Sequence, residues 1–281
     1  MVVLYYLFWE RVDVMSEMIK SYDGMPLFFN KEVSDGDKAV AVIVHGLCEH
    51  QGRYDYLADF FHKNGIGTYR FDHRGHGRSE GEKSHYDDFN EILDDTNVIV
   101  DLAIAENPDK PVFLLGHSMG GYAVALFGVK FPDKKLRGII TSGALTKDNG
   151  GLIRGVPTGM DSHTQLPNEL GSGVCSVQEV VDWYGKDPYN NKVFTAGLCY
   201  AICGGLDWIS GKEKEFNYPV LMMHGEKDGI VAVQDTYDFF AAVSSKDKQM
   251  KIYGNLFHEI FNEYCRDEVI GDTVNWILNR I

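Results

Sequence analysis

The sequence has no long hydrophobic run at its N-terminus. The apolar run from Val2 to Trp9 has eight residues, whereas a membrane-spanning helix needs about 20. A signal peptide is also a poor fit, because no basic region precedes the run and no small-residue cleavage site follows it. We expect Met15 or Met18 to be the biological start, with a short interfacial anchor as the alternative.

Cysteine is scarce and unpatterned. The five cysteines are odd in number and contain no Cys-x-x-Cys pair, so neither a disulfide framework nor a zinc ribbon is predicted; they are Cys48, Cys175, Cys199, Cys203 and Cys265. A reducing, cytoplasmic compartment fits this usage best.

Basic residues are fewer than acidic residues. There are 27 lysines and arginines against 41 aspartates and glutamates, which gives a formal net charge of −14. Such a field repels phosphate backbones, which argues against nucleic-acid binding and against stable anchoring on anionic lipid. A neutral lipid substrate and transient contact with a membrane stay open.

The overall composition is that of a globular protein, with 44% hydrophobic and 24% charged residues. Disordered, collagen-like and disulfide-scaffold proteins are therefore excluded. The 281 residues allow one sizeable core, because a chain of this length buries roughly three quarters of its unfolded surface. Two small domains and a single large α/β domain are both compatible with the length.

Short apolar runs alternate with segments of helical periodicity along most of the chain. Runs typical of buried strands are residues 39–44, 67–71, 112–115, 136–141, 220–223 and 250–253. Such alternation predicts an α/β fold with a mainly parallel sheet and helices on both faces. Residues 18–33, around Asp23-Gly24, indicate an antiparallel hairpin at the sheet edge.

One glycine-rich segment interrupts this alternation. Residues 143–214 also carry large apolar side chains, including Trp183 and Trp208, and a plain loop of such length is very unusual. We interpret the segment as a cap, or lid, inserted into a core formed by residues 1–142 and 215–281. An ordinary subdomain with no role in binding is the alternative.

A Gly-x-Ser-x-Gly pattern follows the strand predicted at 112–115. It reads Gly116-His117-Ser118-Met119-Gly120, and a helical segment comes next. In this strand–turn–helix setting the serine occupies a sharp, strained turn that exposes its hydroxyl above the strand ends. The pattern predicts Ser118 as a nucleophile, whereas a glycine-rich turn with an ordinary serine is the less favoured interpretation.

A serine nucleophile needs a base that takes its proton and an acid that orients the base. In this type of fold the chain order is serine, acid, histidine, with the partners in loops after later strands. His258 is the one histidine that follows the loop containing Asp228, so it is the predicted base. Asp228 is the preferred acid because its shorter side chain suits a fixed hydrogen bond, and Glu226 remains the alternative.

The developing oxyanion needs donors as well. The backbone N–H of Met119, directly after the nucleophile, is one candidate, and that of Leu47, in the loop after residues 39–44, is the other. His45 is expected to support this loop as a structural histidine.

Two further motifs resemble functional sites, but their residues and spacing predict other roles. His258-Glu259-Ile260-Phe261-Asn262 places asparagine where a zinc motif needs its second histidine, so no metal is predicted. The segment 72–79 is rich in charged side chains, but its spacing suits a turn tied down by them. No complete dinucleotide or phosphate-loop motif is present, and no cofactor is expected.

Taken together, the motifs resemble the monoacylglycerol lipase and lysophospholipase branch of the α/β-hydrolase superfamily. The matching stretches are His45-Gly46-x-x-Glu49-His50-x-x-Arg53-Tyr54, Asp72-His73-Arg74-Gly75-His76-Gly77-x-Ser79, Gly116-His117-Ser118-Met119-Gly120-Gly121, His224-Gly225-x-x-Asp228 and His258-Glu259-x-x-Asn262-Glu263. The resemblance extends from about Ser21 to the C-terminus, but within the cap only around residues 176–188.

The resemblance implies an eight-stranded core, the triad Ser118, Asp228 and His258, and a mobile cap over an acyl tunnel. It also implies that Glu49 and Arg53 help to hold the polar end of the substrate, and a surface ion pair is the alternative for those two. Cys48 departs from the pattern, because relatives usually carry glycine there.

The expected function is therefore hydrolysis of monoacylglycerol-type, single-chain lipid esters through an acyl-serine intermediate. A lysophospholipase, a short-chain or aryl esterase and a thioesterase with the same triad are the alternatives within enzymes. A non-catalytic binding protein on the same fold is the alternative outside them. Any membrane contact is expected to be transient and to run through the cap.

Overall fold

The computed structural model describes residues 14–169, 171 and 173–281. The run from Val2 to Trp9, with the alternative of a short interfacial anchor, lies outside these residues. Within the described part of the chain, no helix combines the length and the apolar character that crossing a bilayer would require.

The sheet has eight strands, as predicted, in the order β1-β2-β4-β3-β5-β6-β9-β10. All pairs from β4 to β10 are parallel, whereas β1 pairs antiparallel with β2, and β2 with β4. The predicted hairpin is thus present at one edge. The strands are β1 (Met15–Lys20), β2 (Pro26–Glu32), β3 (Ala39–Val44), β4 (Ile66–Phe71), β5 (Val112–His117), β6 (Leu136–Ser142), β9 (Val220–Gly225) and β10 (Lys248–Tyr253).

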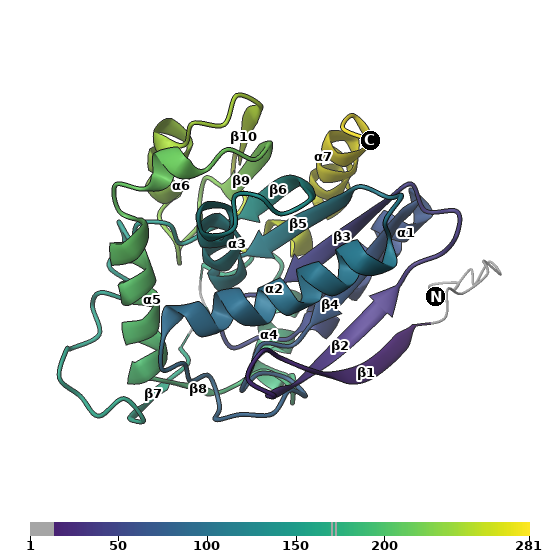
Figure 1. Cartoon of the computed structure of the whole chain (residues 1–281). Helices are drawn as coiled ribbons and strands as arrows, with labels where there is room; N and C mark the ends of the chain where they lie inside the picture. Colours follow the sequence, from purple (N-terminus) through teal and green to yellow (C-terminus); the bar gives the residue numbers. More distant parts are fainter. Residues whose placement is uncertain (1–13, 170, 172) are drawn as a thin grey trace, which may run out of the picture.

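Helices cover both faces of this sheet (Figure 1). One face carries α2, α3 and α6, and the other carries α1 and α7. The bounds of these helices are α1 (Asp55–Lys63), α2 (Phe89–Glu106), α3 (Met119–Lys130), α6 (Val233–Ala242) and α7 (Arg266–Leu278). Three single-turn helices are η1 (Gln51–Tyr54), η2 (Glu213–Glu215) and η3 (Ile260–Asn262).

The uninterrupted apolar strands are explained by two hydrophobic cores, one on each face. Along β3, Val40, Val42 and Val44 pack into the core under α2 and α3, and the intervening residues pack into the core under α1 and α7. Successive strand residues point to opposite faces, so a strand buried on both sides has no polar alternation.

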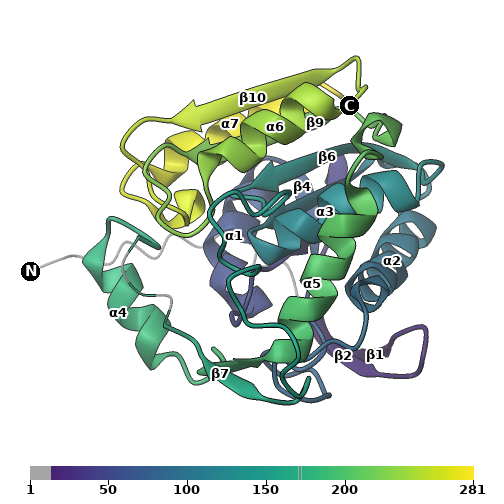
Figure 2. The ribbon, with the colours of Figure 1, turned by 90° about the vertical axis from the view of Figure 1, so that its left-hand side faces the viewer.

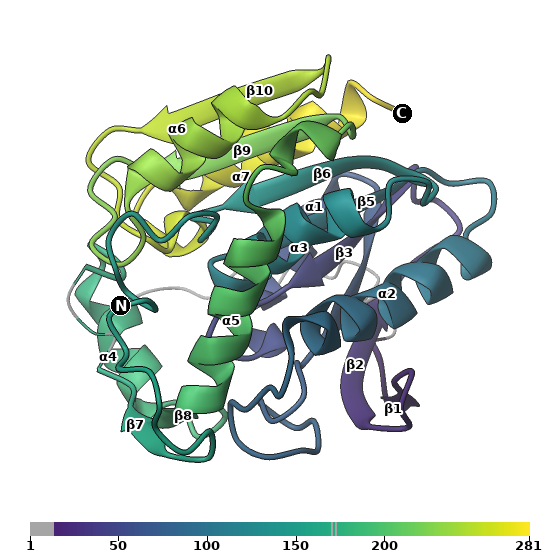
Figure 3. The same ribbon diagram turned by 60° about the vertical axis from the view of Figure 1, so that its left-hand side comes forward.

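Residues 143–214 form a separate group of elements outside the eight-stranded sheet: β7 (Gln165–Pro167), α4 (Gln178–Lys186), β8 (Val193–Thr195) and α5 (Ala196–Ile209). Strands β7 and β8 pair with each other as a small antiparallel sheet. Helix α5 packs its apolar side against α2 and α3 (Figure 3). Helix α4 lies farther out, with Tyr184 as its one buried residue (Figure 2).

Candidate active site

Ser118 lies at the turn between β5 and α3, in a backbone conformation that is strained for any residue with a side chain. Its φ is +55° and its ψ is −117°, and its N–H donates to the carbonyl oxygen of Ser142 at 2.8 Å. The flanking glycines are required by close backbone approach: a Cβ at Gly116 would lie 2.1 Å from the oxygen of Gly120, and one at Gly120 would lie 2.1 Å from that of Val44. The predicted strained turn is therefore present.

Asp228 and His258 come together although they follow different strands. Asp228 lies in the loop after β9 and His258 in the loop after β10, and Nδ1 of His258 is 2.6 Å from Oδ2 of Asp228. The other carboxylate oxygen accepts the N–H groups of Ile230 and Val231, both at 2.8 Å. These bonds fix the orientation of the Asp228 carboxylate. Nε2 of His258 stays available for another partner.

Ser118 and His258 line one pocket of about 270 Å³. No hydrogen bond joins their side chains among the described residues. Such bonds are often long in the absence of substrate and tighten in the complex with it. Glu226, the alternative acid, is exposed, and its carboxylate accepts only the Asn255 N–H, at 3.4 Å, within the described chain.

The electrostatics of the site stabilise the protonated form of the His258 imidazole beside an ionised acid. Burial opposes the charged form of His258, but the Asp228 carboxylate outweighs it and raises the pKa of His258 above its ordinary value. Burial likewise opposes ionisation of Asp228, yet His258 and a bond from His224 hold its pKa well below the usual range. Burial, then repulsion from His258, lowers the pKa of His117 to about 3, so this neighbouring ring is neutral.

The loop after β3 brings Leu47 to the same pocket. Among the described residues, neither the N–H of Leu47 nor that of Met119 has a hydrogen-bond acceptor. Cys48 follows with a φ of +60°, so the loop keeps the left-handed backbone that glycine adopts easily. His45 supports the loop from below, because its Nε2 accepts the N–H of His73 at 3.0 Å.

Glu49 and Arg53, expected to hold the polar end of a substrate, are buried and engaged with protein groups. Glu49 accepts bonds from the Gly46 N–H (2.6 Å), the Tyr54 hydroxyl (2.7 Å) and Nη1 of Arg53 (2.6 Å). The Arg53 guanidinium also forms two bonds of 2.7 Å with Glu259. This network connects the loop of Leu47 to the residue that follows His258. Direct contact of Glu49 or Arg53 with a substrate stays a prediction.

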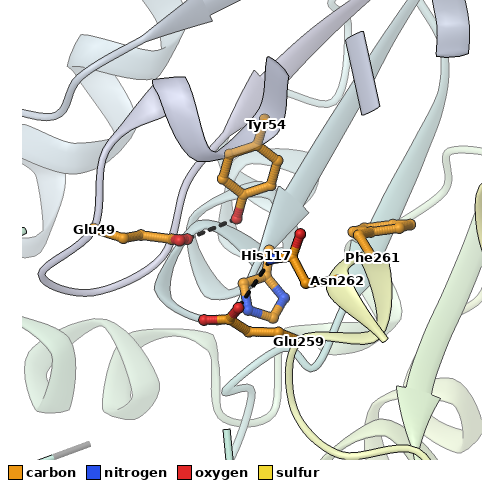
Figure 4. A pocket seen from close by; sticks show the side chains of 6 residues that line it. All are labelled: Glu49, Tyr54, His117, Glu259, Phe261 and Asn262. Carbon is orange, nitrogen blue, oxygen red and sulfur yellow. Dashed lines mark hydrogen bonds between the residues drawn. The ribbon is translucent and has the colours of Figure 1, made fainter. Parts of the chain in front are cut away.

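A second pocket, of about 190 Å³, adjoins the first and has a polar lining (Figure 4). The hydroxyl of Tyr54 and the carboxylate of Glu49 approach it from one side, and His117 lies between them and Glu259. Its lining residues are Glu49, Tyr54, His117, Glu259, Phe261 and Asn262. Asn262, which replaces the second histidine of a zinc motif, donates to Glu259 at 2.9 Å.

Residues 143–214 contribute directly to the pocket of Ser118. Val174 and Tyr184 line it, and the Tyr184 ring lies against the guanidinium of Arg53 at 4.8 Å. Asp187 joins this segment to the loop after β3 through His50, at 3.0 Å. The segment therefore supplies side chains to the wall of this pocket.

Another cluster, not foreseen from the sequence, lies where this segment meets the core. Glu82, His85 and His163 place potential metal-ligand atoms within 4.8 Å of one another. The two imidazoles, however, stack nearly face to face, 4.6 Å apart with 16° between their planes. The nitrogen lone pairs lie in these nearly parallel ring planes, so they do not point to one shared metal position. The ion pair of His163 with Glu82, at 2.8 Å, joins the two loops without a metal.

Comparison with known proteins agrees with this geometry. The family model described as "Serine aminopeptidase, S33" matches residues 35–264. The chain belongs to this family. Within the S33 family it lies in the monoacylglycerol lipase branch of the α/β-hydrolase superfamily, as the resemblance predicts.

Three similar proteins illustrate the placement within the S33 family. The monoacylglycerol lipase of Mycolicibacterium smegmatis is 31% identical over 92% of this chain and 95% of its own. The monoglyceride lipase of Mus musculus is 30% identical over 92% of this chain and 89% of its own. The crystal structure of the Paleococcus ferrophilus monoacylglycerol lipase is 26% identical, with a TM-score of 0.79 over 92% of this chain and all of the other.

Proposed function

We propose that this chain is a serine carboxylic-ester hydrolase that cleaves monoacylglycerol-type, single-chain lipid esters through an acyl-serine intermediate. The 2.6 Å bond between His258 and Asp228, in reach of the pocket that Ser118 lines, is the observation that carries the proposal. Relatives named monoacylglycerol or monoglyceride lipase, which match over nine tenths of the chain, support the choice of substrate class.

In the acylation step, Oγ of Ser118 attacks the ester carbonyl carbon while Nε2 of His258 accepts the hydroxyl proton. The carbonyl oxygen becomes an oxyanion, which the N–H groups of Leu47 and Met119 stabilise; one such donor is worth about 3 kcal/mol of barrier. When the ester bond breaks, the imidazolium returns the proton to the departing alcohol. Asp228 keeps the imidazole in its productive orientation and stabilises its charged form.

Deacylation repeats the same steps with water. His258 accepts a proton from a water molecule as its oxygen attacks the acyl-serine carbonyl. Collapse of the second oxyanion releases the fatty acid and returns the proton to Ser118. The neutral His117 ring beside His258 avoids a second positive charge next to the imidazolium.

The polar pocket of Figure 4 is the proposed place for the alcohol part of the ester. It offers the hydroxyl and carboxylate groups that a glycerol head would bond to, close to the catalytic pocket. Val174 and Tyr184, from residues 143–214, form part of the wall of the catalytic pocket. We therefore propose that residues 143–214 form a cap that moves to admit the acyl chain.

Fluorophosphonate labelling tests the nucleophile. The protein should label on Ser118, and Ser118→Ala should lose both labelling and ester hydrolysis. A non-catalytic binding protein would stay unlabelled, and that result would refute the proposal.

A substrate panel tests the ester class. Long-chain monoacylglycerols should be preferred over lysophospholipids and over short p-nitrophenyl esters at equal concentration. Turnover confined to acetate and butyrate esters would reject the lipid assignment in favour of a short-chain esterase. The relative named "Phospholipase YtpA" from Bacillus subtilis, 28% identical, is the reason to include lysophospholipids.

We also propose a cytoplasmic location and transient contact of the cap with membranes. All five cysteines are free thiols, which suits a reducing compartment. Trp183 on α4 is 59% exposed, an unusual position for so large an apolar ring. Vesicle sedimentation of the wild type against Trp183→Ser tests the membrane contact, and cell fractionation tests the location.

A further inference from the structure

Two buried histidines bind the same carboxylate oxygen of Asp228. His258 approaches Oδ2 with Nδ1 at 2.6 Å, and His224 approaches it with Nε2 at 2.9 Å. The side chains of His224 and Asp228 have no exposed surface. Only one of the two imidazoles takes part in the mechanism described above, which leaves His224 without an assigned role.

The surroundings of His224 determine where its proton lies. Nε2 is also 3.0 Å from the carbonyl oxygen of Val231, so both of its neighbours are acceptors and it must carry a hydrogen. Nδ1 is 2.7 Å from Oγ1 of Thr236, a hydroxyl that can donate to it. The hydrogen on Nε2 is shared between the carbonyl oxygen of Val231 and Oδ2 of Asp228, and Nδ1 accepts the hydroxyl hydrogen of Thr236. The two acceptors beside Nε2 therefore select the tautomer that donates to Asp228, and Thr236 holds the other ring nitrogen.

We propose that His224 is a positioning residue for the catalytic acid, acting through Asp228. Its N–H orients Oδ2 toward His258. The same N–H also reduces the negative charge on Oδ2 that acts on the His258 imidazole. This inference rests on the proposed triad. The buried acid then has four donors, because two backbone N–H groups hold Oδ1 and two imidazoles hold Oδ2. Such outer contacts orient a catalytic group without touching substrate.

Loss of this donor should raise the pKa of His258. Without the N–H of His224, more of the carboxylate charge acts on His258, so the imidazole becomes more basic. The other titratable groups that act on His258 are His117, Glu259 and Glu49, and the substitution leaves all three in place. The acid limb of the kcat/KM profile should therefore move to higher pH.

Two substitutions distinguish the effect of the N–H donor from the effect of side-chain volume. His224→Met fills the same volume without an N–H, and it should lower kcat about 10-fold while KM changes less than about 2-fold. His224→Gln keeps an N–H at similar reach and should restore most of kcat and the wild-type acid limb. A folded His224→Gln protein as impaired as His224→Met would overturn the proposal. Circular dichroism and thermal unfolding establish the folded state of each variant.

A double-mutant cycle tests whether His224 acts through Asp228. In the Asp228→Ala background, His224→Met should change the remaining activity by less than about 2-fold, because its target is gone. Losses that multiply would show an independent structural effect and overturn the proposal. If His224→Met fails to fold, Thr236→Val replaces it in the cycle, since it removes the hydroxyl that holds Nδ1 of His224 and so orients the ring.

The same experiment distinguishes failure of this inference from failure of the proposed function. Full activity of Asp228→Ala or Ser118→Ala would reject the triad itself. Inactive Ser118→Ala and Asp228→Ala, together with a His224→Met protein of wild-type kcat and acid limb, would reject only the role of His224.

Discussion

Gly143, in the loop after β6, packs directly against the imidazole of His258. A Cβ at Gly143 would lie 3.0 Å from Nδ1 of His258 and 3.4 Å from Oδ2 of Asp228, and its φ is +52°. The absence of a side chain therefore leaves room for the bond between His258 and Asp228.

Gly143→Ala should displace the imidazole. We expect kcat to fall about 10- to 100-fold, since small misplacements of catalytic groups are costly. Stability should fall by about 1–2 kcal/mol from the left-handed backbone. Gly151→Ala is the matched control, because Gly151 has a φ of +70° with no atom within 4 Å of the added Cβ. It should lose stability alone; an equal loss of kcat in both variants would contradict the contact argument.

Glu49→Gln should loosen the loop that carries Leu47. An amide cannot accept all three bonds of Glu49 and leaves Arg53 with Glu259 as its remaining carboxylate. We expect a loss of about 2–4 kcal/mol in unfolding free energy, as when one partner of a buried ion pair is removed. kcat should fall about 10-fold. Urea denaturation and steady-state kinetics measure the two effects.

The control for Glu49→Gln is a surface pair. Lys134→Gln removes the half-exposed contact with Asp101 and should change stability by less than about 0.5 kcal/mol. A Glu49→Gln enzyme with raised KM but normal kcat and stability would contradict the support of the loop and leave Glu49 with a role in substrate binding alone.

The pH dependence follows from the raised pKa of His258. The proposed base acts only when neutral, so kcat/KM should fall as the pH drops through a value above 6.5. A profile with its acid limb below that ordinary value would contradict the coupling to Asp228. Stopped assays across pH 5 to 9 on a soluble ester measure the limb.

The same two groups affect stability with opposite signs. The depressed pKa of Asp228 contributes stability above the ordinary value of 3.8, and this contribution is lost as the pH falls toward the folded-state value. The raised pKa of His258 contributes stability below 6.5, and this contribution is lost as the pH rises through its folded-state value. Asp228→Asn should abolish the pH dependence of the unfolding free energy that each group contributes. Denaturation series at low and at neutral pH measure this.

Asp235 anchors the base of residues 143–214. It is fully buried on α6, and its carboxylate accepts the four successive backbone N–H groups of residues 146–149. Asp235→Asn should cost about 2–3 kcal/mol, because buried N–H groups lose a charged acceptor. It should also speed limited proteolysis near these residues. Asp238→Asn, on the same helix, is the control: its partly exposed carboxylate contacts this segment only through the side chains of Lys147 and Asn149, so both effects should be far smaller.

Much of the fold was predictable because it depends on short-range patterns. The run 39–44 is apolar at every position since β3 is buried on both faces, and that pattern identifies a strand of a parallel sheet. The turn at Ser118 was predictable for a similar reason, because close backbone approach requires glycine on both sides. The paired strands β7 and β8 were not predicted, since three residues each are too few for periodicity.

The supporting contacts of the site were not predictable from patterns. Arg53 and Glu259 are 206 positions apart, and nothing in either local sequence indicates that they pair. His224 belongs to a recognised motif, but its bond to Asp228 depends on the backbone between them and on Thr236 from α6. Such contacts depend on how distant elements pack.

The sheet order also has a consequence for the timing of activity during synthesis. The proposed nucleophile follows the central strand β5, whereas the proposed acid and base follow β9 and β10, which complete the outer edge and come from the last quarter of the chain. A nascent chain on the ribosome, or a product truncated before residue 258, therefore carries Ser118 without the groups that activate it. Such a chain is unable to attack cellular esters until residue 258 has been synthesised and folded into place.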